Sequence, residues 1–221
     1  MKQDNKGLLA SLNFSVLTLV FSLGLVSSLM SSAQATERGR ALFGLCISCH
    51  GAEGYGNAAL GAPAIAGMPE WYLTAQLVKF GSGARGQHPT DDAGNRMRPM
   101  ARTLKSDDYK AVAAYLATLK PRTPEQTVGG NIEAGKGAYS TCLACHGANG
   151  EGNQALNAPP LNATNDWYLV RQLHNFKNKV RAGDAAKDPT GSVMFGMAST
   201  LADEQAMKNV ISYVQSLQPI K

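Results

Sequence analysis

Cys46-Ile47-Ser48-Cys49-His50 and Cys142-Leu143-Ala144-Cys145-His146 are one five-residue pattern written twice, and together they use all 4 cysteines of the 221-residue chain. Cys-x-x-Cys-His is the pattern of covalent haem attachment. Two thiols three positions apart can add across the two vinyl groups of one porphyrin, while the adjacent imidazole reaches the iron. The sequence therefore predicts two haem c groups, attached through Cys46, Cys49, Cys142 and Cys145, with His50 and His146 as iron ligands.

Two other uses of paired cysteines have to be weighed against haem. Zinc accepts four thiolates from two such pairs, but these pairs begin 96 positions apart, farther than zinc-ribbon pairs usually lie. A zinc site also gives no reason for a histidine after each pair. Disulfides of the thioredoxin type suit a βαβ pattern, whereas the flanks here are Gly-rich and helical. Haem is favoured, and both alternatives stay open at this point.

Residues 1–35 have the features of an export signal. Lys2 and Lys6 give a basic start, an apolar run extends from Phe14 to Met30, and Ala33-Gln34-Ala35 offers small residues for cleavage after Ala35. Export predicts a periplasmic protein. The apolar run is close to the length that spans a bilayer, so an uncleaved anchor, with membrane association through this segment, is the alternative.

An internal repeat predicts two domains. The halves match at an offset of 96 positions, which grows by one and then two toward the end of each copy. Matched pairs outside the haem patterns include Gly39/Gly135, Phe43/Tyr139, Pro63/Pro159, Trp71/Trp167, Gln76/Gln172, Met97/Met194, Met100/Met197 and Tyr115/Tyr213. Pro121, Pro124 and Gly129-Gly130 separate the copies. We expect a first domain over 36–120, a linker over 121–132 and a second domain over 133–221.

Each copy predicts the same series of helices and no convincing strand, which indicates an all-α fold. A short helix over 36–45, or 133–141, leads into the haem pattern, and a Gly-rich loop follows it. Apolar residues then recur at helical spacing in both copies, as Leu73, Leu77, Phe80 and as Leu169, Leu173, Phe176. A terminal helix in the first copy has Ser106 as its expected N-cap and presents on one face Val112, Tyr115, Leu116 and Leu119. The corresponding helix of the second copy presents Val210, Tyr213, Val214 and Leu217.

This order of elements resembles class I cytochrome c, and its duplication is similar to the two-haem cytochrome c4 group. The resemblance covers Thr36 to Lys221 and implies a tandem of two all-α domains, each wrapped around one haem. It implies a crossing of first and last helices in each domain, at Gly39, Phe43 and Tyr115 and at Gly135, Tyr139 and Tyr213. It also implies that the carbonyls of Pro63 and Pro159 accept the Nδ1 hydrogens of His50 and His146.

The second axial ligand of each iron is expected to be a methionine from a predicted loop ahead of the terminal helix. A lone methionine is more often a flexible filler of the core, but here the residues recur at matched positions. Met97 and Met194 lie 18 and 19 residues before Tyr115 and Tyr213, the spacing that the resemblance implies for the ligand. Met100 and Met197 are the alternatives, because either thioether could bind iron. His88 and His174 have no matching histidine in the other copy, which argues against ligation by them.

An iron held by histidine and methionine exchanges electrons but has no free position for a reactant. The resemblance therefore implies an electron carrier, not an enzyme, between a quinol-oxidising complex or dehydrogenase and a terminal oxidase or reductase. The alternatives are a membrane-associated haem subunit of a dehydrogenase or oxidase complex and a dihaem peroxidase-type enzyme.

Charge gives a weaker indication of the partners. The formal net charge is +5, and basic residues gather around the methionine segments, at Arg96, Arg98, Arg102, Lys177, Lys179, Arg181 and Lys187. Such a surface suits acidic redox protein partners, although a merely solvated face would look the same. The sequence carries no nucleic-acid-binding motif, and it leaves the oligomeric state open.

Overall fold

The computed structural model describes residues 33–217, and the structural statements below concern that part of the chain. Nearly all of the predicted export signal, with its apolar run, lies outside the described residues. Within residues 33–217, no helix combines the length and apolar character needed to cross a membrane. The described residues form helices, loops and two isolated antiparallel bridges, Asn57–Ala62 and Asn153–Ala158. This confirms the all-α prediction.

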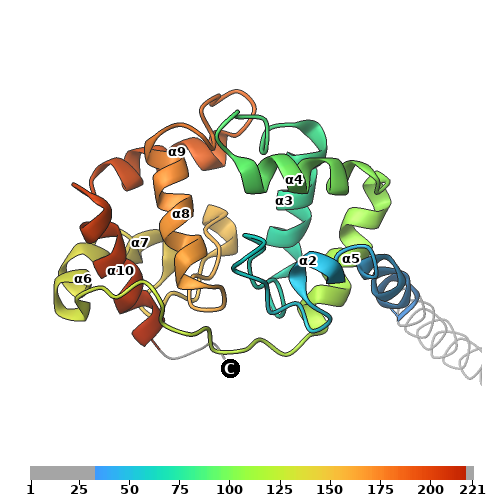
Figure 1. Ribbon diagram of the computed structural model, residues 1–221, viewed down its shortest axis with the longest axis horizontal. Coiled ribbons are helices and arrows are strands. Elements are labelled where there is room, and N and C mark those ends of the chain that lie inside the picture. The colour runs from blue at the N-terminus through green and yellow to red at the C-terminus, as the bar shows by residue number, and fades with distance from the viewer. Residues whose placement is uncertain (1–32, 218–221) are drawn as a thin grey trace, which may run out of the picture.

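Two helical halves lie next to each other and are joined by an extended segment along one edge (Figure 1). The first half contains helical residues 33–43, α2 (Ile47–His50), α3 (Glu70–Ser82), α4 (Asp92–Arg102) and α5 (Ser106–Thr118). The second contains α6 (Ile132–Tyr139), α7 (Leu143–His146), the 3₁₀ turn η1 (Gln154–Leu156), α8 (Asp166–Lys177), α9 (Pro189–Ser199) and α10 (Glu204–Ser216). The halves thus repeat one order of helices, as the internal repeat predicted.

The first and last helices of each half cross at a glycine. A Cβ atom on Gly39 would overlap the Ala111 carbonyl oxygen of α5, and one on Gly135 would overlap the Asn209 carbonyl oxygen of α10. Only a residue without a side chain lets the two backbones approach this closely. An aromatic pair lies beside each crossing, with ring centroids 5.6 Å apart for Phe43–Tyr115 and 5.4 Å for Tyr139–Tyr213. These contacts confirm the crossings that the family resemblance implied.

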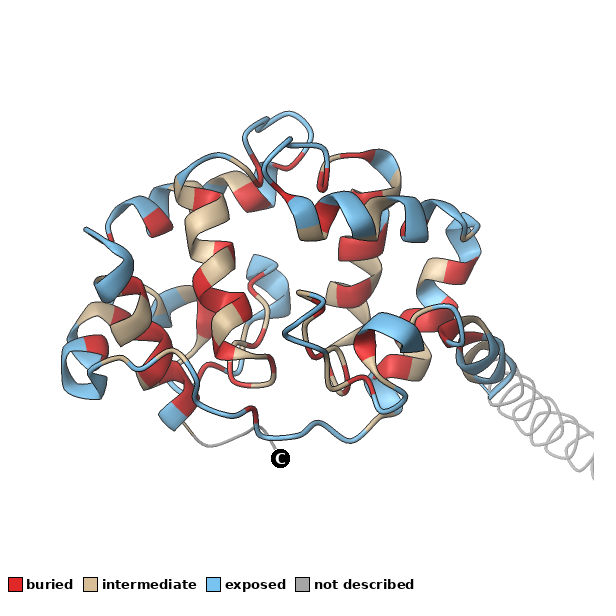
Figure 2. Cartoon of the chain, viewed as in Figure 1, coloured by how far each residue is buried: buried red, intermediate tan, exposed pale blue. Residues whose placement is uncertain are grey.

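The predicted apolar faces of α3 and α8 form the centre of each core. Leu73, Leu77 and Phe80 are buried in one cluster with Val112 and Leu116 of α5. In the second half, Leu169 and Phe176 are buried in the matching place and Leu173 is half-buried. Buried stretches run along α3 and α8, whereas much of α2 is exposed (Figure 2). Packing of such faces, rather than helix propensity, supplies most of the stability of short helices.

The predicted N-cap of α5 is wrong by one position. The cap is Lys105, and Ser106 is the first helical residue. The N–H of Lys105 donates to the Asp108 carboxylate at 3.1 Å, and Asp108 also pairs with Arg38 from the first helix. The helix therefore begins one residue earlier because a carboxylate three residues on, rather than the Ser106 hydroxyl, binds a backbone N–H at its start.

The methionine segments are helices, and the prediction that they are loops is wrong. Asp91 caps α4 by accepting the Gly94 N–H at 3.1 Å, and Asp188 caps α9 by accepting the Gly191 N–H at 2.8 Å. Pro189 stands at the start of α9. An aspartate N-cap followed by proline is a helix-start signal. Ala93, Met97, Met100 and Ala101 recur at helical spacing along α4. The loop was therefore an expectation from the family resemblance rather than from the spacing of apolar residues.

Candidate haem-binding sites

A single helical turn carries each Cys-x-x-Cys-His pattern. Cys46 and Cys142 are the N-caps of α2 and α7, and His50 and His146 are the last residues of these helices. Residues three positions apart lie on the same face of a helix, so the two thiols of each pattern point to one side. The three-residue spacing of the cysteines on a helix thus gives the arrangement of thiols that covalent attachment to one porphyrin needs.

Both histidines of the patterns are buried and oriented by a backbone carbonyl. Their exposed fractions are 7% for His50 and 6% for His146. Nδ1 of each ring lies 2.8 Å from a carbonyl oxygen, that of Pro63 or of Pro159. Because a carbonyl only accepts, the proton belongs on Nδ1 and Nε2 keeps its lone pair for a metal.

The electrostatics favour the same form of the ring. Burial lowers the pKa of both histidines, and the hydrogen bond to the proline carbonyl opposes this only in part. The rings are therefore neutral at physiological pH, which is the state that ligates a metal. The hydrogen bonds to Pro63 and Pro159 are those that the resemblance implied.

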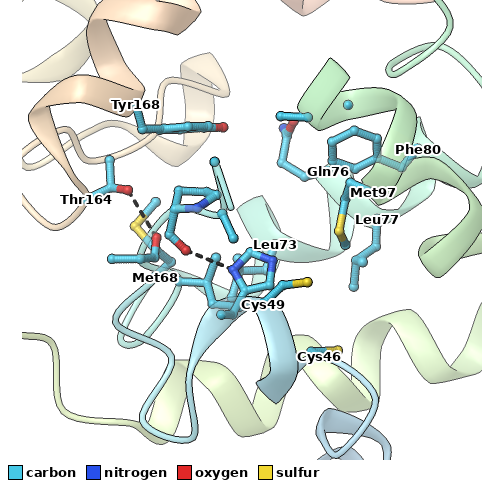
Figure 3. A pocket seen from close by; sticks show the side chains of 18 of the residues that line it. Cys46, Cys49, Met68, Leu73, Gln76, Leu77, Phe80, Met97, Thr164 and Tyr168 are labelled. Carbon is cyan, nitrogen blue, oxygen red and sulfur yellow. Dashed lines mark hydrogen bonds between the residues drawn. The ribbon is translucent and has the colours of Figure 1, made fainter. Parts of the chain in front are cut away.

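Each half closes a cavity that brings a pattern together with a methionine. Met97 of α4 lines the first cavity with Cys46, Cys49 and His50, and Figure 3 places Met97 beside Leu77 and Phe80, opposite Tyr168. Met194 of α9 lines the second cavity with Cys142 and His146. Cys145 lies on the same turn but is not among the residues lining that cavity.

The alternative methionines reach the same cavities from one helical turn further on. Met100 and Met197 are 40% and 38% exposed, whereas Met97 and Met194 are half-buried and pack against the hydrophobic clusters of their halves. The more deeply placed thioether of each pair is therefore the one that the sequence spacing favoured.

The residues present fit a haem better than the alternatives. The cavities have apolar walls, built in the first half from Leu73, Leu77, Phe80, Val112 and Leu116 and in the second from Leu169, Phe176, Val210, Ile211 and Val214. Such walls suit a porphyrin, and an imidazole with a thioether suits its iron. Cys46 and Cys49 line the first cavity and Cys142 lines the second, so the two pairs do not meet at one tetrahedral zinc site. All four cysteines are free of disulfides.

The two remaining histidines lie away from these cavities. Nδ1 of His88 is 2.9 Å from the Thr90 hydroxyl, and Nε2 of His174 is 3.5 Å from the Glu204 carboxylate. Neither ring lines the first or the second cavity. This agrees with the expectation that they are not iron ligands.

A buried cluster that was not predicted from the sequence joins the two halves. Arg85 and Arg181 are only 7% and 6% exposed. Each guanidinium donates to both Gln76 and Gln172, at distances between 2.8 and 3.0 Å, and Arg85 also donates to the Tyr168 hydroxyl at 2.9 Å. The internal repeat gave a hint of this cluster, since both arginines and both glutamines match at the same offset. That the four side chains contact one another depends on how the two halves pack. Arg181 is therefore buried and does not belong to the predicted partner-binding surface.

This cluster holds more positive charge than its partners neutralise. The glutamines and the tyrosine are neutral, and within the described chain Nε of both arginines is buried without a hydrogen-bond partner. Burial alone would raise the pKa of Tyr168, but the two guanidinium groups outweigh it and lower that pKa. Arg85 lines the first cavity and Arg181 the second. Buried guanidinium groups of this kind suit carboxylates, which a haem carries on its propionates.

Each cavity is completed by the opposite half. Thr164 and Tyr168 of the second half line the first cavity (Figure 3), and Tyr72 and Lys79 of the first half line the second. The contact is held by specific hydrogen bonds, including Thr164 Oγ1 to the Ala64 carbonyl at 3.0 Å and the Ala64 N–H to Asn165 Oδ1 at 2.6 Å. The two candidate sites are therefore neighbours across one packed interface.

Comparisons with known proteins agree with this arrangement. The family described as Cytochrome c matches residues 36–120 and 132–218. Cytochrome c4 of Azotobacter vinelandii is 28% identical across 93% of this chain and 100% of that protein. A thiosulfate dehydrogenase electron acceptor of Stutzerimonas stutzeri (strain A1501) is 34% identical across 72% of this chain and 73% of that protein. The crystal structure of reduced recombinant cytochrome c4 from Pseudomonas stutzeri aligns with a TM-score of 0.66 at 26% identity, covering 83% of this chain and 98% of that one. Each matched segment contains one Cys-x-x-Cys-His pattern.

Proposed function

The chain belongs to the cytochrome c family, and we propose that it works in the periplasm as a carrier between a quinol-oxidising complex or dehydrogenase and a terminal oxidase or reductase. It is a dihaem electron carrier similar to cytochrome c4, not an enzyme, and its two domains imply two covalently attached haem c groups. When bound, each haem supplies an iron that gains and loses one electron.

The proposal assigns the eight predicted site residues to two equivalent sets. Cys46 and Cys49 attach the first haem, and His50 and Met97 hold its iron. The second set is Cys142, Cys145, His146 and Met194. The observation that carries this proposal is that an oriented neutral imidazole and a half-buried thioether line the same apolar cavity in both halves. An iron held by both the imidazole and the thioether would have no coordination position left for a substrate.

The ligand assignment is tested by removing one thioether at a time from the purified holoprotein. Met97→Ala and Met194→Ala should each abolish the thioether-to-iron absorption band of one haem and lower its reduction potential, because a thioether favours ferrous iron. Met100→Ala and Met197→Ala are matched controls from the next helical turn and should leave the band in place. A band that survives Met97→Ala and disappears in Met100→Ala would transfer the role to Met100, and the same comparison decides between Met194 and Met197.

The choice of donor is supported by a relative. The Stutzerimonas stutzeri protein that shares 34% identity is named as the electron acceptor of a thiosulfate dehydrogenase, which favours a dehydrogenase as one donor for this chain. Oxidised holoprotein should be reduced rapidly by its true donor, and the rate should fall with ionic strength if the basic surface steers an acidic partner.

A membrane-associated haem subunit of a dehydrogenase or oxidase is the second candidate. It is favoured by the apolar run from Phe14 to Met30, which is close to the length of a membrane span. Mass analysis of the mature N-terminus separates the two: a chain beginning at Thr36 in the periplasmic fraction supports the free carrier, and an intact N-terminus in membranes supports the subunit.

A further inference from the structure

The two haem cavities are surrounded by different charges, although the halves that form them repeat. Arg85 and Asp91 line the first cavity. The matching residues of the second half are Arg181, which lines the second cavity, and Asp188, which caps the start of α9. Two further arginines, Arg96 and Arg171, line only the first cavity. The matched positions in the other copy are Val193 and Ala75, neither of which carries a charge.

The second cavity has one extra cation, and it lies in an ion pair. Lys79 lines that cavity, and its matched residue is Asn175. Its ammonium group, however, lies 2.6 Å from Asp188 Oδ1 and 2.7 Å from the Thr190 hydroxyl. Because Asp188 is the match of Asp91, the formal charge is +2 around the first cavity, from Arg85, Arg96, Arg171 and Asp91, and +1 around the second, from Arg181, Lys79 and Asp188. The first cavity therefore carries the larger positive charge.

Arg171 is the better placed of these two guanidinium groups. It belongs to α8 of the second domain and reaches across the interface, where Nη2 donates to the Gly61 carbonyl at 2.7 Å. Its guanidinium lies over the rings of Trp167 and Tyr168, at 5.1 and 5.5 Å from their centroids. Within the described residues its Nε is buried without a hydrogen-bond partner, and no carboxylate lies within ion-pair distance. Arg96 is exposed, so solvent screens it more strongly.

We propose that Arg171 tunes the haem of the other domain and makes the first haem the higher-potential one of the pair. The proposal rests on the proposed function. Reduction adds one electron to a haem, and a fixed positive charge nearby favours that added electron. Transfer from the second iron to the first oxidises one by one electron and reduces the other by one, with no proton or further reactant. An electron shared by the two domains therefore resides mainly on the first.

Spectroscopic redox titration of the purified holoprotein tests this directly. The wild type should give two one-electron steps, and Arg171→Ala, which installs the residue found at the matched position, should lower the higher step and narrow the gap between them. Arg171→Gln should do the same while retaining an N–H for the Gly61 carbonyl, and Arg171→Lys should keep most of the separation. Lys136→Ala, which removes an exposed cation from α6 of the same domain, should leave both steps in place.

The outcome identifies which idea fails. The step lowered by Arg171→Ala must be the one that Met97→Ala also moves, since both act on the first haem. If Arg171→Ala and Arg171→Gln lower the other step, or move neither step more than Lys136→Ala does, the tuning role is overturned while the carrier function stands. If the wild type shows no reversible one-electron steps, the proposed function itself is wrong.

Discussion

Gly135 illustrates how much of this fold depends on single residues. It lies in α6 where that helix crosses α10, and a Cβ atom there would overlap the Asn209 carbonyl oxygen and approach Cβ of Tyr213. A backbone carbonyl inside a helix cannot move aside without loss of its own hydrogen bond. The crossing, which places the Tyr139–Tyr213 pair, therefore requires glycine at this position.

We expect Gly135→Ala to destabilise the holoprotein by about 3 kcal/mol, the upper part of the usual range for an overpacked core. Gly137 is a matched control in the same helix, since a Cβ atom there meets nothing within 4 Å. Gly137→Ala should stabilise by about 0.5 to 1 kcal/mol through helix propensity. Denaturant unfolding measures both, and similar effects of the two substitutions would show that the crossing is looser than described.

At the scale of elements, the methionine-bearing helices α4 and α9 are the main departure from the expected secondary structure. Both begin at an aspartate N-cap, and their methionines occupy equivalent positions, Met97 and Met194. A helix fixes the direction of the thioether more firmly than a loop would. The presentation of the proposed axial ligand therefore depends on the stability of one short helix in each half.

Gly196→Ala tests whether α9 is helical in the presence of haem. Gly196 lies inside α9, and a Cβ atom there meets nothing within 4 Å. Alanine should therefore stabilise the holoprotein by about 0.5 to 1 kcal/mol and leave the spectrum of the second haem unchanged. A loss of stability or a disturbed thioether-to-iron band would contradict a helical segment here.

At the scale of the whole molecule, a buried ion pair links the two domains. The Asp188 side chain is 1% exposed and that of Lys79 is 18% exposed. Burial by itself would raise the pKa of Asp188, but the Lys79 ammonium and the Gly191 N–H outweigh it and lower that pKa. Burial also lowers the pKa of Lys79, and Asp188 offsets this only in part. Lys79 remains charged at acid pH, so the carboxylate governs the response to acid.

The sign of the pH dependence follows from the lowered pKa of Asp188. The folded state binds this proton less readily than the unfolded state does, so the stabilisation is complete above the unfolded pKa and is lost as the pH falls through the folded one. Asp188→Asn retains a capping group but leaves Lys79 unpaired. At neutral pH it should cost about 3 kcal/mol, a typical value for a broken buried pair.

Unfolding measured between neutral and acid pH checks this. Asp188→Asn should make the free energy of unfolding less dependent on acid pH. The variant already lacks the charged carboxylate that acid protonates in the wild type. Asp184→Asn is the control, since it disrupts an exposed pair with Lys187, and it should leave unfolding almost unchanged. A variant as acid-sensitive as the wild type would mean that other carboxylates dominate.

Features that depend on residues close together in the chain could be predicted without the structure. The haem patterns, the helices with a regular apolar face and the duplication follow from short spacings or from the comparison of one half with the other. The glycines at the helix crossings were implied by the family resemblance. The same reasoning missed the α5 cap by one residue, because the Asp108 carboxylate rather than the Ser106 hydroxyl binds a backbone N–H there. It also missed the two methionine helices, although Asp91 and Asp188 are residues typical of an N-cap.

Contacts between the domains could not be predicted, because they depend on how the two halves pack. Arg85 lies 87 residues from Gln172, and Arg181 lies 105 residues from Gln76, so no local pattern links them. The same holds for Arg171 at Gly61 and for Lys79 at Asp188. A charge acquires its energetic role from burial and from the groups that face it, and both are properties of the packed interface rather than of the chain.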